Sequence, residues 1–507
     1  MAADGGLLLL LAFILLLSRM LLVLAKGSKQ IREKMKHSTP PGPTGLPVIG
    51  NLHQLGSHQH RTLHELSKRY GPLMHLQLCS VPVLVVSSAE LAEEILKKND
   101  LKVSSRPSIT PWRQLSYNFS DVGFSPYGAT WRELRKITVV SLLNARKVEG
   151  FRYVREEEVE RMIASISSLA SLSKPINLSK LLHALSNSIV CRAAFGKRFH
   201  NAGEGYSETK FHGIFQETQA LLSKFFVADY IPWAGWADVL TGLQARLKKN
   251  FAEIDAFCKE VIEAHINVHR ASEDQEEDFV DVLLRLQKKD STHLTMNHIK
   301  GLIMDIFIAA TETSSATVEY AIAELIRNPS AMLRAQEEVR GMVGTKGKAE
   351  ESDLSQLNYL KSIIKETFRL HPVAPLLIPR ETLDTIDING YSISPKTRVL
   401  VNAWAIGRDP KTWQEPDKFI PERFMDSTID FKGHDFQLIP FGAGRRICPG
   451  ITFGIMTVEL ALANLLYAFN WEDLKGMGGG GIDMDEGNGI AVRLKNDLQL
   501  KATKCKY

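Results

Sequence analysis

Cysteine is scarce in this sequence. The five cysteines are widely spaced and odd in number, and none forms a CxxC pair or another short metal-ligand spacing: Cys79, Cys191, Cys258, Cys448 and Cys505. A disulfide framework needs paired cysteines and an oxidising compartment. The sequence therefore argues against disulfide stabilisation and favours a reducing compartment.

Excess charge, internal repeats and nucleotide-binding fingerprints are also missing. The 62 Lys and Arg residues exceed the 57 Asp and Glu residues by only five, and the basic residues are scattered. We therefore expect no nucleic-acid partner, because nucleic-acid binders concentrate basic charge on one face. No Rossmann fingerprint or flavin-binding segment is present, so any redox chemistry would need electrons from a separate protein.

Residues 5–25 are almost entirely apolar. This length is close to the roughly 20 residues that cross a bilayer. A basic flank follows, with Lys26, Lys29 and Arg32 among its residues, and the positive-inside rule places everything after it in the cytosol. We therefore predict a membrane anchor over residues 1–25. A cleaved signal peptide is the alternative, but neither a basic n-region nor a small-residue cleavage site is evident.

A proline-rich stretch, PPGPTGLP, follows at residues 40–47. It can form neither a helix nor a central strand, so we expect a stiff hinge over residues 26–50 and one continuous domain over 51–507. Strand-like runs occur at residues 73–78, 81–86, 385–393 and 398–402, and the remainder is mostly helical in pattern. The longest predicted helix runs from Thr295 to Asn328 and is apolar on most faces, which predicts that it crosses the interior.

The most informative segment is PFGAGRRICPG at residues 440–450, followed by an apolar helical pattern over 451–467. Cys448 therefore precedes a helix N-terminus, where free backbone donors and the helix dipole favour thiolate over thiol. The glycines let the backbone approach a flat ligand, and Arg446 can pair with an acidic group on that ligand. For a lone cysteine, the alternative is a buried structural residue beside a basic turn.

This loop resembles the heme-binding signature of the cytochrome P450 family. Tyr70-Gly71-Pro72, the SSRP sequence at residues 104–107 and the proline hinge are similar to the plant microsomal (A-type) branch. The resemblance implies the cytochrome P450 fold, mainly α with a smaller β region, preceded by a single N-terminal transmembrane helix. It also implies a heme-thiolate monooxygenase in which Cys448 binds the iron of heme b.

The resemblance assigns further heme contacts residue by residue. Phe441 and Gly442 in the cysteine loop would contact the heme. Cationic partners of its propionates, together with one tryptophan, would be Arg106, Trp131, Arg135, Arg380 and Arg446.

The segment AATETS at residues 309–314 resembles the family's oxygen-activation motif. Thr313 would hydrogen-bond the bound oxygen, and Glu312 would help deliver protons through water, because reduction of O2 consumes two protons. The alternative is a Glu-Thr pair on a polar helix face. Ala310 departs from the family pattern, which usually has glycine at this position. Its methyl group would either narrow the oxygen groove or lessen the local distortion of the helix.

Glu366 and Arg369 lie three residues apart on a predicted helix, so their side chains share one face. A surface ion pair is the ordinary explanation of such spacing. The position of the pair between the long helix and the cysteine loop resembles the family's buried triad, which Arg423 would complete. The expected role is structural.

Substrate contacts are expected in four mainly apolar segments, which predicts a lipophilic small molecule. The related plant enzymes commonly carry Phe where this chain has Asn488, and the change suggests a bulkier or more oxygenated substrate. Terpenoids, alkaloids and phenolics of plant specialised metabolism all remain open. The residues singled out are Ile308, Ala309, Ala374, Leu376, Asn488 and Ile490.

The resemblance also implies the partners and the location. Electrons would come from NADPH through NADPH-cytochrome P450 reductase, with cytochrome b5 as a further partner. Arg132, Lys136 and Arg445 would meet an acidic surface on the reductase, although scattered surface charge explains them equally well. The chain would be a single-pass protein of the endoplasmic reticulum membrane with a cytosolic catalytic domain.

Two other functions compete with monooxygenation. A heme-thiolate isomerase or dehydratase would rearrange an oxygenated substrate without O2 or a reductase. A membrane heme carrier or sensor would bind heme without turnover. Retention of both Glu312 and Thr313 favours the monooxygenase over either alternative.

Overall fold

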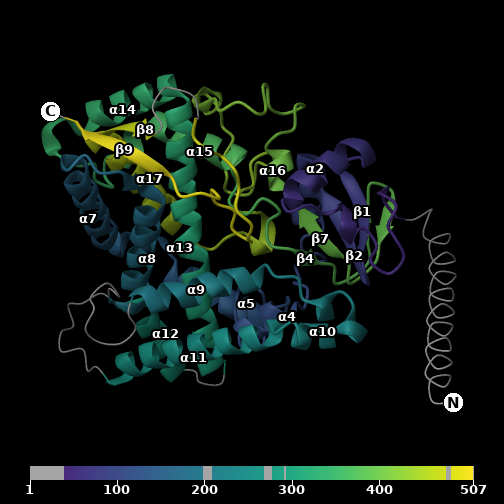
Figure 1. Ribbon diagram of the computed structural model, residues 1–507. Helices are drawn as coiled ribbons and strands as arrows, with labels where there is room; N and C mark the ends of the chain where they lie inside the picture. Colours follow the sequence, from purple (N-terminus) through teal and green to yellow (C-terminus); the bar gives the residue numbers. More distant parts are fainter. Residues whose placement is uncertain (1–38, 198–207, 268–276, 290–292, 475–480, 506–507) are drawn as a thin grey trace, which may run out of the picture.

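The computed structural model describes residues 39–197, 208–267, 277–289, 293–474 and 481–505. The anchor predicted over residues 1–25 and the first part of the hinge lie outside these ranges. Figure 1 shows a larger helical region on one side of the molecule and a smaller sheet, β1–β2–β7–β4, on the other. The prediction of a mainly helical fold with a smaller β region is confirmed.

The central element is α13 (Met296–Arg327), which the sequence predicted to within one residue at each end. Thr295 caps its first turn: its Oγ1 accepts from the His298 amide at 3.3 Å, and the His298 ring accepts from the Thr295 amide at 3.2 Å. Pro329 begins the next helix and ends this one. Because most faces of α13 are apolar, the helix is stable only when other helices cover it.

The main hydrophobic core forms around α13. The helices that pack there, against α13 or against one another, are α7 (Arg152–Ser171), α8 (Leu178–Phe195), α14 (Pro329–Val343), α15 (Asn358–Leu370) and α17 (Ile451–Ala468). Among the described residues, α17 is the one helix that is long and apolar enough to cross a membrane, but most of it is buried in this core. The other helices are α2 (Gln59–Tyr70), α3 (Ala89–Glu93), α4 (Thr110–Leu115), α5 (Ala129–Lys136), α6 (Ala145–Gly150), α9 (Glu208–Leu222), α10 (Trp236–Leu240), α11 (Leu243–Asn267), α12 (Phe279–Lys289) and α16 (Ala403–Ile406).

The main sheet joins β1 (Leu73–Leu78) and β2 (Val81–Val86) as an antiparallel hairpin. β2 continues in parallel to β7 (Arg398–Val401), which pairs with β4 (Arg380–Glu381). The strand predicted over residues 385–393 is instead a hairpin of β5 (Ile386–Ile388) and β6 (Tyr391–Ile393), because the Asn-Gly turn between them takes positive φ at both positions. A third sheet joins β3 (Ile176–Asn177), β9 (Gln499–Lys504) and β8 (Phe469–Asp473).

The described part of the proline segment lies against β1. The Pro41 carbonyl accepts from the His75 amide at 2.9 Å, and Gly50 bridges to Leu78. A methyl group on Gly42 would overlap the His75 carbonyl, so only glycine allows this approach. Segment 40–50 is therefore attached to the sheet near both of its ends.

Gly301 marks another close approach, between α13 and the loop that precedes α5. A methyl group at this position would overlap the carbonyl of Ser120. We predict that Gly301→Ala lowers stability by about 1–3 kcal/mol, because overpacking displaces the loop. At an exposed helical position, Gly→Ala normally raises stability instead, by roughly 0.5–1 kcal/mol.

Gly341→Ala in α14 is the matched control, since nothing lies within 4 Å of its added methyl group. Thermal unfolding of both variants measures the effect. A higher midpoint for both would show that the loop is not held tightly against α13.

Candidate active site

Cys448 lies three residues before the first residue of α17, as the sequence indicated. Its amide donates to the Phe441 carbonyl at 3.0 Å, which closes the loop on itself. Gly442 and Gly444 take positive φ, +70° and +68°. A side chain at Gly444 would overlap the Leu96 carbonyl, so the loop requires glycine there for space as well as for conformation.

The thiol of Cys448 differs from the sequence expectation in one respect. The Gly450 amide and the Arg135 guanidinium lower its pKa, as a helix N-terminus and a nearby cation should, but burial outweighs both and the pKa is raised. The Arg135 side chain itself is fixed by a 2.6 Å bond to the Ile447 carbonyl. A thiolate here therefore depends on a cation bound at Sγ, since a coordinated metal ion deprotonates a thiol outright.

Arg446 and Trp131 form a buried pair beside this loop. The guanidinium carbon lies 4.1 Å from the centre of the Trp131 ring. Arg446 donates to three backbone carbonyls, those of Ser104, Val122 and Ser125, at 2.6–3.2 Å. The Trp131 indole N–H donates to the same Val122 carbonyl at 3.1 Å.

Arg106 and Arg380 lie in the same region and are also buried. Arg106 donates to the carbonyls of Gly123, Ile378 and Pro379 at 2.6–3.0 Å. Arg380 donates to the Ala443 carbonyl at 2.6 Å and pairs with Asp100 at 3.0 Å. The structure thus brings together the cationic residues that the sequence proposed for the propionates.

The charge of this cluster is only partly balanced. Burial and mutual repulsion lower the pKa values of Arg106 and Arg446, the latter to about 9. Most partners of these guanidiniums are neutral carbonyls, and buried charge is costly unless it is paired. A planar ligand with two carboxylates, such as heme, fits a site that combines this excess positive charge with a buried cysteine sulfur.

Phe441 in the cysteine loop belongs to an aromatic cluster. Its ring packs edge-on against Phe368 and Phe431, with centroids 5.1 and 5.6 Å apart. Gly442 faces Leu377, whose Cδ1 lies 3.7 Å from the position of an added Cβ. The loop is therefore supported by an aromatic cluster from α15 and the segment before the loop.

Thr313 and Glu312 follow one another on α13 and point in different directions. The Thr313 hydroxyl donates to the Ala309 carbonyl at 2.7 Å, and Ala309 is exposed although it lies in the middle of a largely buried helix. Glu312 instead faces α8 and α9. Burial raises the pKa of its carboxyl group, which Arg493 partly offsets.

Glu366, Arg369 and Arg423 meet as the sequence proposed. Arg369 makes two 2.7 Å bonds to the Glu366 carboxylate, and both side chains are fully buried. Arg423 adds a bond of 3.1 Å to the same carboxylate.

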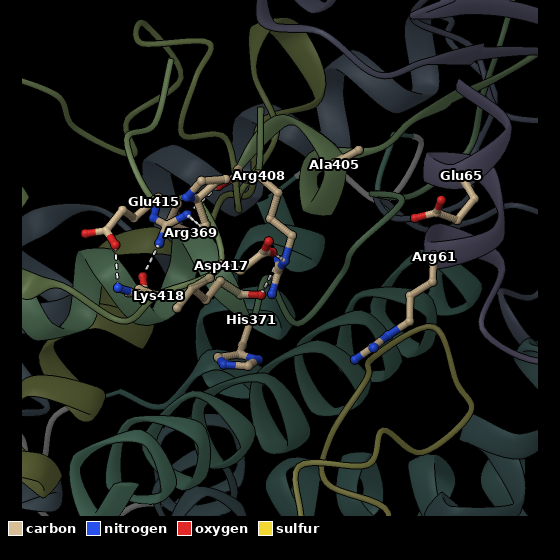
Figure 2. Close-up of polar contacts among 12 residues, drawn as sticks. Arg61, Glu65, Arg369, His371, Ala405, Arg408, Glu415, Asp417 and Lys418 are labelled. Atoms are coloured by element: carbon tan, nitrogen blue, oxygen red, sulfur yellow. Dashed lines mark hydrogen bonds and ion pairs between the residues drawn. The ribbon is translucent and has the colours of Figure 1, made fainter. Parts of the chain in front are cut away.

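Arg369 also donates to the carbonyls of Gly407, Pro416 and Lys418 at 2.6–2.9 Å. Figure 2 shows Arg369 beside Lys418 and Arg408, with Arg408 turned toward Asp417. The network fixes the irregular chain that leads toward the cysteine loop.

The proposed substrate residues are only partly brought together. The Val492 amide donates to the Val373 carbonyl at 2.8 Å, so the segments of Ala374 and Ile490 run side by side. Ile308 and Ile490 pack against the main core, and Asn488 is exposed. Leu376 packs elsewhere, against the small core between α2 and the sheet. Its neighbour Leu377 is the residue that contacts the cysteine loop.

Sequence reasoning missed a pair of buried carboxyl groups, Asp121 and Asp305. Asp305 on α13 accepts from the amides of Val122 and Gly123 at 2.6 and 3.1 Å, and Asp121 accepts from Phe124 at 3.0 Å. Burial raises the pKa of both, that of Asp305 to about 6. A lone aspartate in the apolar run IMDIFI was the available signal.

Comparisons with known proteins agree with the family that the cysteine loop indicates. The family model Cytochrome P450 matches residues 40–501. Cytochrome P450 71A1 of Persea americana is 52% identical over 460 residues, which cover 90% of this chain and 91% of the relative. Strychnine-11-hydroxylase of Strychnos nux-vomica is 47% identical over 485 residues, which cover 95% and 94%.

Among solved structures, the chain resembles a zebra fish cytochrome P450 determined with abiraterone. The TM-score is 0.74 at 24% identity, and the alignment covers 89% of this chain and 100% of the other. This likeness shows the fold alone.

The buried carboxyl pair makes stability depend on pH. Because the folded pKa of Asp305 lies above the ordinary 3.8, its proton stabilises the folded state below about pH 4. That contribution is lost as pH rises through about 6. Asp305→Asn keeps an oxygen acceptor for the two amides and removes the titration. We expect the parent to lose on the order of 2–3 kcal/mol relative to the variant between pH 4 and 7.

Thermal unfolding of parent and variant across this pH range measures the difference. Asp384→Asn, at an exposed position, is the control and should follow the parent at every pH. A constant difference between the parent and Asp305→Asn would mean that the pKa of Asp305 is not raised in the folded state.

Proposed function

Since this chain belongs to the cytochrome P450 family, as a plant A-type monooxygenase, we propose that it inserts one atom of O2 into a lipophilic small molecule at a heme b held by Cys448. We propose three parts: an anchor over residues 1–25, a hinge over 26–50 and a catalytic domain over 51–507. The observation that carries the proposal is the contact between the cysteine loop's helix and α13. A Cβ at Gly454 in the first turn of α17 would lie 3.7 Å from the Ser314 hydroxyl, next to Thr313.

When bound, a thiolate-ligated heme supplies electron density that favours cleavage of the O–O bond. The residues of this chain then have separate tasks. Trp131 and the arginine cluster hold the carboxylate side of the ligand. Thr313 presents a hydroxyl on the accessible face of α13, and Glu312, which faces α8 and α9, would pass protons toward it through water. The methyl group of Ala310 narrows the space beside Thr313.

Electrons are proposed to come from NADPH through NADPH-cytochrome P450 reductase, with cytochrome b5 as an alternative donor. Arg132 and Lys136 are exposed on α5, the helix whose Arg135 contacts the cysteine loop. Arg445 exposes about half of its side chain on the loop itself. A basic surface so close to Cys448 suits an acidic partner.

Association with the endoplasmic reticulum membrane is supported by a second feature besides the N-terminal sequence. Trp233, Trp236 and Leu240 are 71%, 61% and 77% exposed. The segment lies next to the turn between β1 and β2, because the Tyr230 carbonyl accepts from the Ser80 amide. Exposed tryptophan and leucine side chains at the end of the molecule that carries the hinge suit a lipid interface.

The substrate is proposed to be a lipophilic compound of plant specialised metabolism. Most of the candidate contact residues are apolar, and Asn488 offers an exposed amide to an oxygenated group. One relative is named for hydroxylation of strychnine. That name supports an alkaloid over a terpenoid or a phenolic. Dependence of product formation on NADPH distinguishes this function from an isomerase or dehydratase, and a heme carrier or sensor would form no product.

The first test is the reduced carbon monoxide difference spectrum of the full-length protein. We expect a Soret band shifted strongly to the red, because thiolate donates to the iron. Cys448→Ala should lose this band. Cys505→Ala, a partly buried cysteine far along the chain, should keep it. Absence of the band from folded, heme-loaded parent protein would falsify the assignment of Cys448.

The reductase surface is tested by Arg132→Glu with Lys136→Glu. The double variant should raise the KM for reductase on the order of tenfold at low salt, and added salt should reduce the difference. Turnover driven by hydrogen peroxide should not change, since it needs no reductase. Lys174→Glu with Lys180→Glu makes the same charge change at other exposed positions and should leave the KM as it is. Equal effects of the two pairs would point to net charge rather than to a docking surface.

A further inference from the structure

A small cavity with both polar and apolar lining residues lies between α8, α9 and α13, on the side of α13 that Glu312 faces. Its volume is about 20 Å³. The polar residues that line it are His183, Asn187, Gln216, Gln219, Thr311 and Glu312. A cavity must offer roughly 10–15 Å³ and two to four polar partners to hold a water molecule, so this one has room for a single ordered water.

Glu312 needs such a water. Its carboxylate makes no hydrogen bond or ion pair with another side chain in the described part of the protein, although it is largely buried. A carboxyl group that is largely buried in this way can exchange protons with solvent through a bound water. The cavity is the place where the structure has room for one.

His183 on α8 lines the same cavity. It is partly exposed, and Asn187, four residues later on α8, lies on the same helix face. An imidazole can accept a proton on one nitrogen and release one from the other, near neutral pH. His183 is the residue of the cavity lining, other than Glu312 itself, whose side chain can carry a proton in this way.

Gln219 closes the cavity from α9. Its side-chain amide donates to the Ile308 carbonyl at 3.1 Å, on the turn of α13 that precedes Glu312. This bond holds α9 against α13 at the level of the cavity.

We propose that this cavity holds a water that carries protons from His183 to Glu312, so that His183 is the entry point of protons for oxygen reduction. The inference rests on the proposed monooxygenase function and adds the route by which Glu312 is reprotonated. His183 acts through Glu312 and touches neither the substrate nor the heme.

The proton balance defines the test. Substrate, O2, two electrons and two protons give hydroxylated substrate and water, and both protons must come from solvent. His183 gives a proton to the water, the water gives one to Glu312, and His183 takes another from solvent. Hydrogen peroxide brings the oxygen, the electrons and both protons together, so peroxide-driven hydroxylation needs no delivery along this route.

The experiment compares His183→Ala and His183→Gln with the parent, using heme-loaded full-length protein and reductase. Glutamine can still hydrogen-bond the water, but it cannot titrate. Both variants should lower the yield of product per NADPH on the order of tenfold. Both should keep the peroxide-driven rate and the spectral shift on substrate binding. His434→Ala, an exposed histidine elsewhere, is the matched control.

Each outcome decides the inference. Loss in both variants with an intact peroxide-driven rate supports proton entry at His183. Normal coupling in His183→Gln, or parallel loss of the peroxide-driven rate, overturns it in favour of a structural role. A parent that shows no NADPH-dependent product at all overturns the proposed function instead, and the two failures are therefore distinguishable.

Discussion

The ion pair of Glu366 and Arg369 is the constraint on which much of the remaining architecture depends. Both side chains are removed from water, and each would be costly without the other. The remaining donors of the pair therefore need hydrogen-bond acceptors, and Arg369 donates to the carbonyls of Gly407, Pro416 and Lys418. An irregular stretch without helix or strand hydrogen bonds is fixed in this way, and the cysteine loop begins shortly after it.

A similar principle operates around Cys448. Arg446 joins Ser104 to a position 342 residues later in the chain. Arg106 joins the loop before α5 to the chain before β4. Guanidinium groups suit this task because their donors form a rigid fork that can bond several carbonyls at once. The sheet, the loop before α5 and the cysteine loop are thus held by side chains that would also meet the acidic edge of a ligand.

The sequence predicted those features that depend on local pattern. The apolar pattern that follows Thr295, the proline after Asn328 and the apolar run after Cys448 predict where α13 and α17 lie, although α13 is stable only when other helices cover its apolar faces. Features that depend on long-range packing were not predictable. Leu376 and Leu377 are the same residue type, so the sequence does not show which of them faces the cysteine loop. The positive φ of Leu377 decides it. The raised pKa of the Cys448 thiol results from burial, which the local pattern of loop and helix does not reveal.

The unbalanced charge of the arginine cluster affects the stability of the chain before it binds heme. Heme binding to the folded state alone shifts the folding equilibrium by an amount that grows with the free heme concentration. Here the shift includes relief of repulsion among Arg106, Arg380 and Arg446. The newly made polypeptide is therefore least stable before it binds heme, and proteolysis removes molecules that stay heme-free. We therefore expect the abundance of the protein to depend on the supply of heme as well as on the rate of translation.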